Sequence, residues 1–283
     1  MPTDAVVERA AAKVNLCLHV TGRRTDGYHL LDSLVVFAGV ADRITARLGS
    51  GFSLAVDGPE AGGLGVDASN LVSRAAAAMG VADVALELHK CLPVASGVGG
   101  GSADAAATLR ALARLTGRPL PPPAVVLALG ADVPVCLAGL PARMQGIGEV
   151  LTLLPPLPVA AMVLVNPRIA VPTPAVFAAL ASRTNPPVPA PPTAGWRDFA
   201  ALAGWLRDGT RNDLAAAAQS IAPVLTQVEA ALLATRDCAL ARMSGSGATC
   251  FGLYPDQPAA LAAADSLRIR HPGWWVTEAA MLA

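Results

Sequence analysis

Two charged residues in otherwise apolar stretches, Lys13 and Asp132, have the side chains best suited to chemistry in this sequence. Asp132 stands in the bend Gly130-Ala131-Asp132-Val133-Pro134. A carboxylate is costly to bury without a partner. We therefore expect Asp132 either to be a helix-capping or turn residue or to act as a positioned base or charge partner. In the second case Lys13 is a candidate neighbour that would keep the carboxylate ionised.

A glycine-rich stretch, LPVASGVGGGSADAAAT (Leu92 to Thr108), follows an alternating strand pattern and leads into an alanine-rich helix pattern. Glycines allow positive φ and a close approach of the backbone to a ligand. The N–H groups at a helix start favour an anion. The order strand, glycine turn, helix therefore predicts a phosphate-binding loop. The alternative is a glycine turn that only connects two elements.

This loop fits neither common nucleotide motif. A P-loop requires Gly-Lys-Ser/Thr, but Gly101 is followed by Ser102 and Ala103. A dinucleotide fingerprint that begins at Gly97 requires glycine at position 102, which is serine. A second small-residue turn near the C-terminus is another candidate phosphate-binding turn. Its residues are Ser244, Gly245, Ser246, Gly247 and Thr249.

The first strand and the turn after it carry polar side chains in a pattern that suits a flat ring. Alternation in AAKVNLCLHV (Ala11 to Val20) places Lys13, Asn15, Cys17 and His19 on one face. That face is either solvent-facing or functional. Tyr28 and His29 follow the Asp26-Gly27 turn, and aromatic and imidazole groups commonly bind a ring by stacking and edge hydrogen bonds.

The elements that must position these residues alternate between strands and helices. We expect strands at 11–20, 30–37, 84–90, 159–165 and 250–254, with short strands within 44–56 and a strand at Trp274-Trp275. Helices are expected at 71–79, 102–115, 124–129, around Phe177, from Asn212-Asp213 to 219, at 221–235 and near the C-terminus. Residues 143–149 are expected to be a turn, and the proline-rich segment 181–195 an exposed loop. LTLLPPLP marks a passage into a second domain.

The overall composition indicates a soluble protein with a sizeable core. The 21 basic and 21 acidic residues balance, which argues against a surface for nucleic acid. Five scattered cysteines form no C-x-x-C pair, which favours reduced thiols in the cytoplasm over a zinc site or disulfides. The most apolar window contains five prolines and Asp132, so we expect no membrane segment. We expect a monomer or a weak homodimer.

Three segments in this order, AKVNLCLHVTGRRTDGYH, LPVASGVGGGSADAA and MSGSGATCFGLY, resemble the GHMP kinase superfamily. Within it, Lys13-Val14-Asn15-Leu16 with Asp26-Gly27-Tyr28-His29 resembles the kinases of 4-diphosphocytidyl-2-C-methyl-D-erythritol. The resemblance implies an α+β, two-domain GHMP kinase fold. Residues 1–155 would form an ATP-binding domain like ribosomal S5 domain 2, and residues 156–283 a ferredoxin-like C-terminal domain.

The resemblance also implies the reaction and the roles of individual residues. ATP, with Mg²⁺, would phosphorylate the 2-hydroxyl of the cytidyl substrate in the non-mevalonate isoprenoid pathway. Asp132 would be the catalytic base, and Lys13 would orient it. Asn15 would hold the substrate, Tyr28 and Phe177 would bracket the cytosine, and His29 would read its edge. ATP would contact Asn70, Lys90 and the loop residues Pro93, Val94, Ala95, Ser96, Gly97, Val98, Gly99, Gly100, Gly101, Ser102 and Ala103. No carboxylate cluster indicates a protein-built metal site.

The sequence departs from the family pattern in two ways, and it leaves three alternative functions open. Ala95 and Ser96 stand where the family usually has glycine, and Ala103 often has a serine counterpart. The first alternative is a GHMP kinase for homoserine, mevalonate or a sugar, which would have no base to stack on Tyr28 and His29. The second is a non-catalytic nucleotide-binding relative, and the third is a dinucleotide-dependent oxidoreductase.

Overall fold

The computed structural model describes residues 5–282 and divides into two compact units, neither of which is continuous in sequence. The first unit comprises residues 5–12, Val40–Val94 and Gly99–Gly139. The second unit comprises Lys13–Gly39, Ala95–Val98 and the chain from Leu140 onward. The glycine stretch therefore contributes residues to both units. The predicted family-domain boundary after residue 155 stays a prediction.

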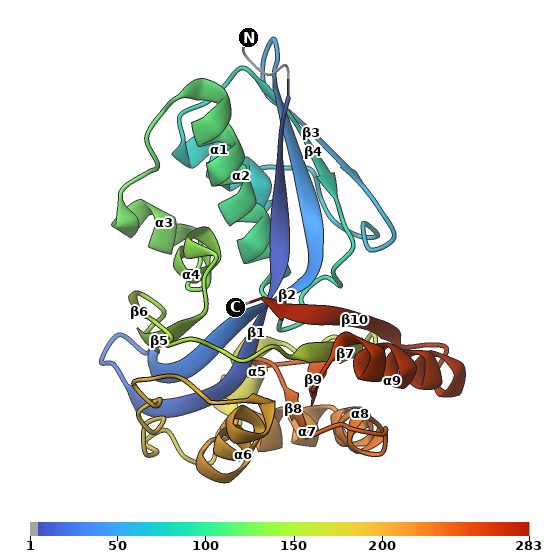
Figure 1. The fold of residues 1–283 in the computed structure, drawn as a ribbon. Helices are drawn as coiled ribbons and strands as arrows, with labels where there is room; N and C mark the ends of the chain where they lie inside the picture. The colour runs from blue at the N-terminus through green and yellow to red at the C-terminus, as the bar shows by residue number, and fades with distance from the viewer. Residues whose placement is uncertain (1–4, 283) are drawn as a thin grey trace. The chain divides into compact units, whose positions relative to one another are not determined.

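Two long strands contribute residues to both units (Figure 1). These are β1 (Val6–Arg23) and β2 (His29–Leu48), which pair with each other. The predicted strands at 11–20 and 30–37 are confirmed, but both extend further. In β1 the polar face is as buried as the apolar face, because Lys13, Asn15 and His19 are at most 3% exposed. The solvent-facing interpretation of this face is therefore wrong.

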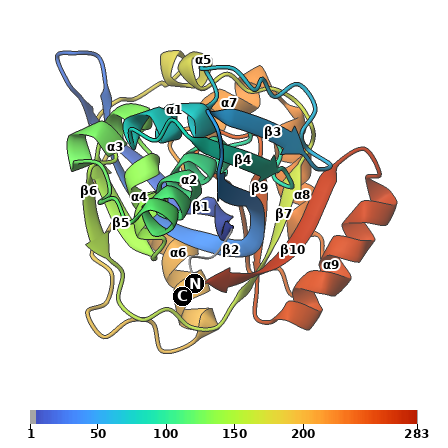
Figure 2. The same cartoon turned by 90° about the horizontal axis from the view of Figure 1, so that it is seen from above.

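The first unit combines the β1–β2 pair with two further strand pairings and four helices. The C-terminal part of β2 pairs antiparallel with β4 (Val84–His89), which pairs parallel with β3 (Ser53–Asp57). The helices are α1 (Leu71–Ala78), α2 (Gly100–Thr116), α3 (Pro123–Leu129) and α4 (Val133–Ala138). Helix α2 packs against α1 and α4, and α1 and α2 lie together on one side of the strands (Figures 1 and 2).

Helix α2 follows directly from its sequence. Leu109 and Leu112 form the buried stripe, and small alanines let neighbouring helices approach closely. The helix ends at Gly117, whose φ of 71° is left-handed and whose N–H donates to the Ala113 carbonyl. The predicted helix and its glycine stop are confirmed.

The second unit contains an antiparallel sheet in the order β10 (Trp275–Leu282), β7 (Ala161–Asn166), β9 (Cys250–Tyr254), β8 (Leu240–Met243). The N-terminal part of β2 pairs with β5 (Ala142–Gly146), and β5 pairs with β6 (Val150–Leu153). The helices are α5 (Thr173–Ala178), α6 (Phe199–Gly209), α7 (Ala215–Ile221), α8 (Val224–Leu233) and α9 (Gln257–Arg270).

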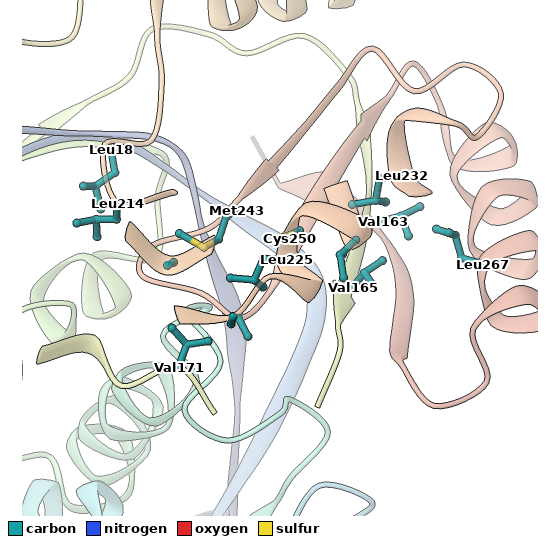
Figure 3. Close-up of a cluster of buried hydrophobic side chains, with 14 of the residues drawn as sticks. Leu18, Val163, Val165, Val171, Leu214, Leu225, Leu232, Met243, Cys250 and Leu267 are labelled. Atoms are coloured by element: carbon teal, nitrogen blue, oxygen red, sulfur yellow. The ribbon is translucent and has the colours of Figure 1, made fainter. Parts of the chain in front are cut away.

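Apolar residues of this sheet and its helices make one buried cluster (Figure 3). Val163 and Val165 of β7 and Leu225 and Leu232 of α8 are fully buried in it, and α9 adds Leu267. Burial of such side chains is worth roughly 1.5–3 kcal/mol each. The cluster therefore gives the second unit its own core.

Two sequence predictions need correction or extension, and two elements were missed. Residues 143–149 are not only a turn, because Ala142–Gly146 form β5 and turn into β6. Helix α6 and strand β8 were not predicted. Segment 181–195 contains no helix or strand, as predicted, although Val188 is buried. Within residues 5–282, no helix is both long and apolar enough to cross a membrane.

Candidate functional site

Lys13 and Asn15 lie on the buried polar face of β1 and are hydrogen-bonded to each other. The Lys13 ammonium donates to Asn15 Oδ1 at 2.8 Å, and Asn15 Nδ2 donates to Ser33 Oγ of β2 at 2.7 Å. Ser33 Oγ in turn donates to the Cys17 carbonyl at 2.6 Å. This series of hydrogen bonds fixes the orientation of the Asn15 amide, so that its oxygen faces the Lys13 ammonium. Within the second unit, Asn15 therefore orients Lys13.

The two small-residue turns predicted to bind phosphate contact each other in the second unit. Ser244 Oγ accepts from the Asn15 N–H at 3.1 Å and donates to the Gly97 carbonyl at 2.9 Å. The Thr249 N–H donates to the Ser96 carbonyl, and the Lys13 N–H to the Val98 carbonyl, both at 2.9 Å. Residues 95–98 are thus bonded to the 244–249 turn and to β1.

Gly97 is required for this contact. Its φ is +77°, and a Cβ at this position would lie 2.6 Å from the Ser244 carbonyl oxygen and 2.7 Å from that of Gly247. Such distances exclude any side chain unless the backbone moves. The close approach that glycine permits at this position is to the protein's own backbone.

An asparagine from another segment, Asn212, stabilises the 244–249 turn by hydrogen bonds that the sequence did not indicate. Asn212 Nδ2 donates to the carbonyls of Met243 at 2.8 Å and Gly245 at 2.9 Å, while its Oδ1 accepts from the Leu214 N–H. The last bond lies before α7, whose N-cap residue is Leu214 and which has no side-chain cap hydrogen bond. Ser244 and Thr249 are buried, and Ser246 is half-buried with its hydroxyl 2.7 Å from Thr173 Oγ1.

The start of α2 presents backbone donors without a capping side chain. Gly99, with φ 63°, occupies the N-cap position, so the helix has no side-chain cap hydrogen bond from that residue. Gly101 is exposed and Ser102 is half-exposed. Free N–H groups and the positive end of a 17-residue helix suit a phosphate group.

Ala95 departs from the glycine pattern at a conformational cost. Its φ is 50°, in the left-handed region, and its side chain is exposed. An L-residue in this region costs roughly 1–2 kcal/mol relative to its right-handed conformation. The loop thus keeps a geometry suited to glycine.

Two residues expected at the nucleotide have structural partners in the first unit. Asn70 caps α1, with Oδ1 accepting from the Val72 N–H at 2.9 Å. The Lys90 ammonium is buried and donates to Asp42 and to Asp104 Oδ2. We leave both side chains out of the proposed ATP site.

Asp132 belongs to the first unit and stands at the N-cap position of α4. Its side chain makes no capping hydrogen bond to that helix, and it is half-buried. Asp132 therefore does not cap α4 through its side chain, but it does stand in a turn, as the structural alternative allowed. Its pairing with Lys13 stays a prediction.

His29 stacks on Phe177 in the second unit. Their ring centroids are 4.7 Å apart, with an angle of 24° between the planes. His29 Nε2 is buried and, within residues 5–282, has no hydrogen-bond partner. Burial, with Arg23 and Arg183 nearby, lowers the pKa of His29, which favours the neutral imidazole. Tyr28 beside it is 61% exposed.

Metal ions in proteins are bound by clusters of His, Cys, Asp or Glu side chains. Among residues 5–282, no group of three or more His, Cys, Asp or Glu side chains could hold an ion. The donor set therefore does not fit a metal centre built from protein side chains alone.

Comparison with known proteins gives a consistent result across the chain. Residues 66–141 match the model of the GHMP kinases N terminal domain, and residues 193–273 match that of the GHMP kinases C terminal. A protein of Cereibacter sphaeroides named 4-diphosphocytidyl-2-C-methyl-D-erythritol kinase is 58% identical, over 96% of this chain and 98% of its own. A protein of the same name from Ruegeria pomeroyi is 54% identical, over 98% and 100%.

Solved structures agree with these relatives. A crystal structure of 4-(cytidine 5'-diphospho)-2C-methyl-D-erythritol kinase superposes with a TM-score of 0.80 at 34% identity, over 98% of this chain and 100% of its own. Homoserine kinase from Cytophaga hutchinsonii, at 18% identity over 100% of this chain and 96% of its own, has a TM-score of 0.69 and shares the fold. The predicted α+β GHMP kinase fold is confirmed, and this chain belongs to the GHMP kinase family.

Proposed function

We propose that this chain transfers the γ-phosphoryl group of ATP to the 2-hydroxyl of 4-diphosphocytidyl-2-C-methyl-D-erythritol, a step of non-mevalonate isoprenoid biosynthesis. The structural observation that carries the choice of substrate is the unpartnered, buried Nε2 of His29 on the face of Phe177. A neutral imidazole held by an aromatic ring suits hydrogen bonding to the edge of a base. The names of the close relatives support the same substrate.

The proposed catalytic pair is Lys13 and Asp132. The substrate oxygen attacks the γ-phosphorus while the bond to the β-phosphate oxygen breaks, and ADP leaves. The Asp132 carboxylate takes the hydroxyl proton. The Lys13 ammonium, held by Asn15 Oδ1, orients the carboxylate and offsets negative charge. Asn15 also remains a proposed substrate contact.

The proposed ATP site is the glycine stretch from Pro93 to Ala103. The uncapped amides at the start of α2 supply hydrogen-bond donors for the phosphates. Ser102 supplies a hydroxyl. Mg²⁺ would enter as the ATP complex, held mainly by phosphate and water oxygens, and no step here is assigned to it. Ser246 is the proposed anion contact of the 244–249 turn.

The remaining expectations are proposals of the same kind. We expect a cytoplasmic enzyme with a small-molecule partner, acting without nucleic acid or membrane, as a monomer or weak homodimer. The nearest alternative is a GHMP kinase that acts on homoserine, mevalonate or a sugar. A non-catalytic nucleotide-binding relative is the other alternative.

ADP release with ATP and Mg²⁺ tests the choice of substrate. The purified chain is offered the cytidyl substrate, mevalonate or homoserine at matched concentrations. We expect turnover with the cytidyl compound alone, and a raised KM for it in His29→Phe, which keeps the stack and removes the ring nitrogens. Turnover with mevalonate or homoserine and none with the cytidyl compound would contradict the proposal.

A further inference from the structure

A buried cluster of three charged residues lies in the first unit, next to the two ends of the glycine stretch. Lys90 is 2% exposed, Asp42 1% and Asp104 3%. The Lys90 ammonium bridges the two carboxyl groups, donating to Asp42 Oδ2 and, at 2.8 Å, to Asp104 Oδ2. Burial of this kind is costly unless every group is well bonded. The contacts of each member therefore indicate what the cluster stabilises.

Asp42 holds the entry of the glycine stretch. Its second oxygen, Oδ1, accepts from the backbone N–H groups of Cys91 at 2.6 Å and Leu92 at 2.8 Å. These two amides directly precede Pro93, where strand pairing of β4 has ended. Asp42 thus accepts three hydrogen bonds, two of them from the backbone that leads into the loop.

Asp104 lies at the other end of the glycine stretch, in the second turn of α2. Lys90 therefore joins the helix that follows the loop to the carboxyl group that holds the residues before it. Gly100 lies beside this bridge, because a Cβ there would be 3.1 Å from Lys90 Nζ. At this position the glycine makes room for the lysine.

The charge balance of the cluster depends on Asp104. Burial raises the pKa of the Asp104 carboxyl to about 7, although Lys90 lowers it, and Asp42 raises it further. Its Oδ1 is buried and has no hydrogen-bond partner within residues 5–282. A neutral amide of the same shape would keep the Oδ2 bond to Lys90, whereas a methyl group would remove it.

We infer that Asp42, Lys90 and Asp104 form a positioning cluster that fixes the two ends of the phosphate loop, so that ATP affinity depends on it. None of the three side chains belongs to the proposed ATP site. The inference relies on the proposed ATP site. It predicts that variants which break the bridge weaken ATP binding more than a variant that keeps it. Asp104→Asn keeps the bridge, Asp104→Ala breaks it, and Asp42→Asn leaves one acceptor oxygen for three donors.

The test is the dissociation constant of the Mg²⁺ complex of β,γ-imido-ATP, measured by calorimetry on variants that melt cooperatively. We expect at least tenfold weaker binding in Asp42→Asn, about fivefold weaker in Asp104→Ala, and a change within twofold in Asp104→Asn. Glu8→Gln is the matched control. It removes an ion pair to Arg110, which lies on α2 as Asp104 does, but away from the loop. Its affinity should stay within twofold.

Steady-state kinetics separates positioning from general destabilisation. The KM for ATP should rise in Asp42→Asn and Asp104→Ala while the KM for the acceptor stays within twofold. Wild-type affinity for the nucleotide in Asp42→Asn or in Asp104→Ala would overturn the inference. So would an equal loss of affinity in Asp104→Ala and Asp104→Asn, or a loss in Glu8→Gln as large as in these variants. If Asp42→Asn does not fold, the comparison of Asp104→Ala with Asp104→Asn tests the inference. Absence of turnover with the cytidyl substrate would contradict the proposed function alone, because analogue binding needs no acceptor.

Discussion

Asn15 shows how one side chain can determine what its neighbours do. Its amide receives the Lys13 ammonium on one side and donates to Ser33 on the other. Its backbone N–H binds the hydroxyl of Ser244, which also holds the Gly97 carbonyl. A lysine on a flexible stem loses rotamer entropy when it is fixed, and these bonds offset that cost. The residue pattern left this strand face either solvent-facing or functional, and it could not predict that Asn15 orients Lys13.

Replacement of Asp132 tests the proposed base. Asp132→Asn keeps the shape and removes the basic oxygen, so kcat should fall by roughly 10²–10⁴-fold while the KM for ATP stays nearly constant. Asp256→Asn is the matched control, because Asp256 caps α9 by accepting from the Ala259 N–H and asparagine caps equally well. An undiminished rate in Asp132→Asn would remove Asp132 from the role of base.

His19 predicts a pH dependence of stability. Its Nδ1 bonds to the Pro186 carbonyl at 2.9 Å and its Nε2 accepts from the Arg211 N–H at 3.1 Å, which requires a neutral ring. Burial, together with Arg211, lowers the pKa of His19 below 6.5. Between the folded pKa and 6.5 the unfolded chain binds more protons, so the free energy of unfolding rises with pH there.

The contribution of His19 to the free energy of unfolding is therefore complete above about pH 6.5. It is lost as the pH falls toward the pKa of His19 in the folded protein. Urea unfolding from pH 7.5 to 5 measures it, and His19→Gln should have a shallower slope than the wild type. His29 retains part of the slope, because its pKa is also lowered. Equal slopes in the two proteins would contradict this assignment.

Among the elements, the contact between residues 95–98 and the 244–249 turn is the one that local sequence could not predict. Each turn is recognisable by its glycines and serines, but their contact joins residues 147 positions apart. Helix α2 was predictable because its stripe and its glycine stop are local signals. Helix α6 was missed although its Asp198 N-cap and its buried Leu202 and Leu206 are local signals, whereas β8 has only four residues and offers no such signal. Tertiary packing decides such segments.

Gly97→Ala tests this contact between the turns. The added Cβ would meet the Ser244 and Gly247 carbonyls, so we expect a loss of roughly 2–4 kcal/mol in the free energy of unfolding. Gly63→Ala is the matched control, because Gly63 has nearly the same φ, +79°, but open space around it. It should lose roughly 1–2 kcal/mol from backbone strain alone. Equal losses in the two variants, measured by urea unfolding, would show that crowding at Gly97 is unimportant.

At the scale of the whole molecule, the order of three short motifs predicted the family, and the comparisons confirm it. The interleaving of the two units was not predictable, because β1 and β2 contribute to both and their true lengths exceed the alternating patterns. The cluster of Asp42, Lys90 and Asp104 gives no local signal either. Asp104 and Asp42 lie 14 and 48 positions from Lys90 in the sequence, and the resemblance implied only a nucleotide contact for Lys90.

The central claim is that this chain phosphorylates the 2-hydroxyl of the cytidyl substrate, and proton-coupled ³¹P NMR of the reaction mixture tests it most directly. The carbon that bears this hydroxyl also bears the methyl group and no hydrogen, so a phosphomonoester there has no proton on the attached carbon. We predict one new phosphomonoester singlet, formed in equal amount to ADP, with the diphosphate signals of the substrate retained. A doublet or triplet, or inorganic phosphate in place of a phosphomonoester, would contradict the claim.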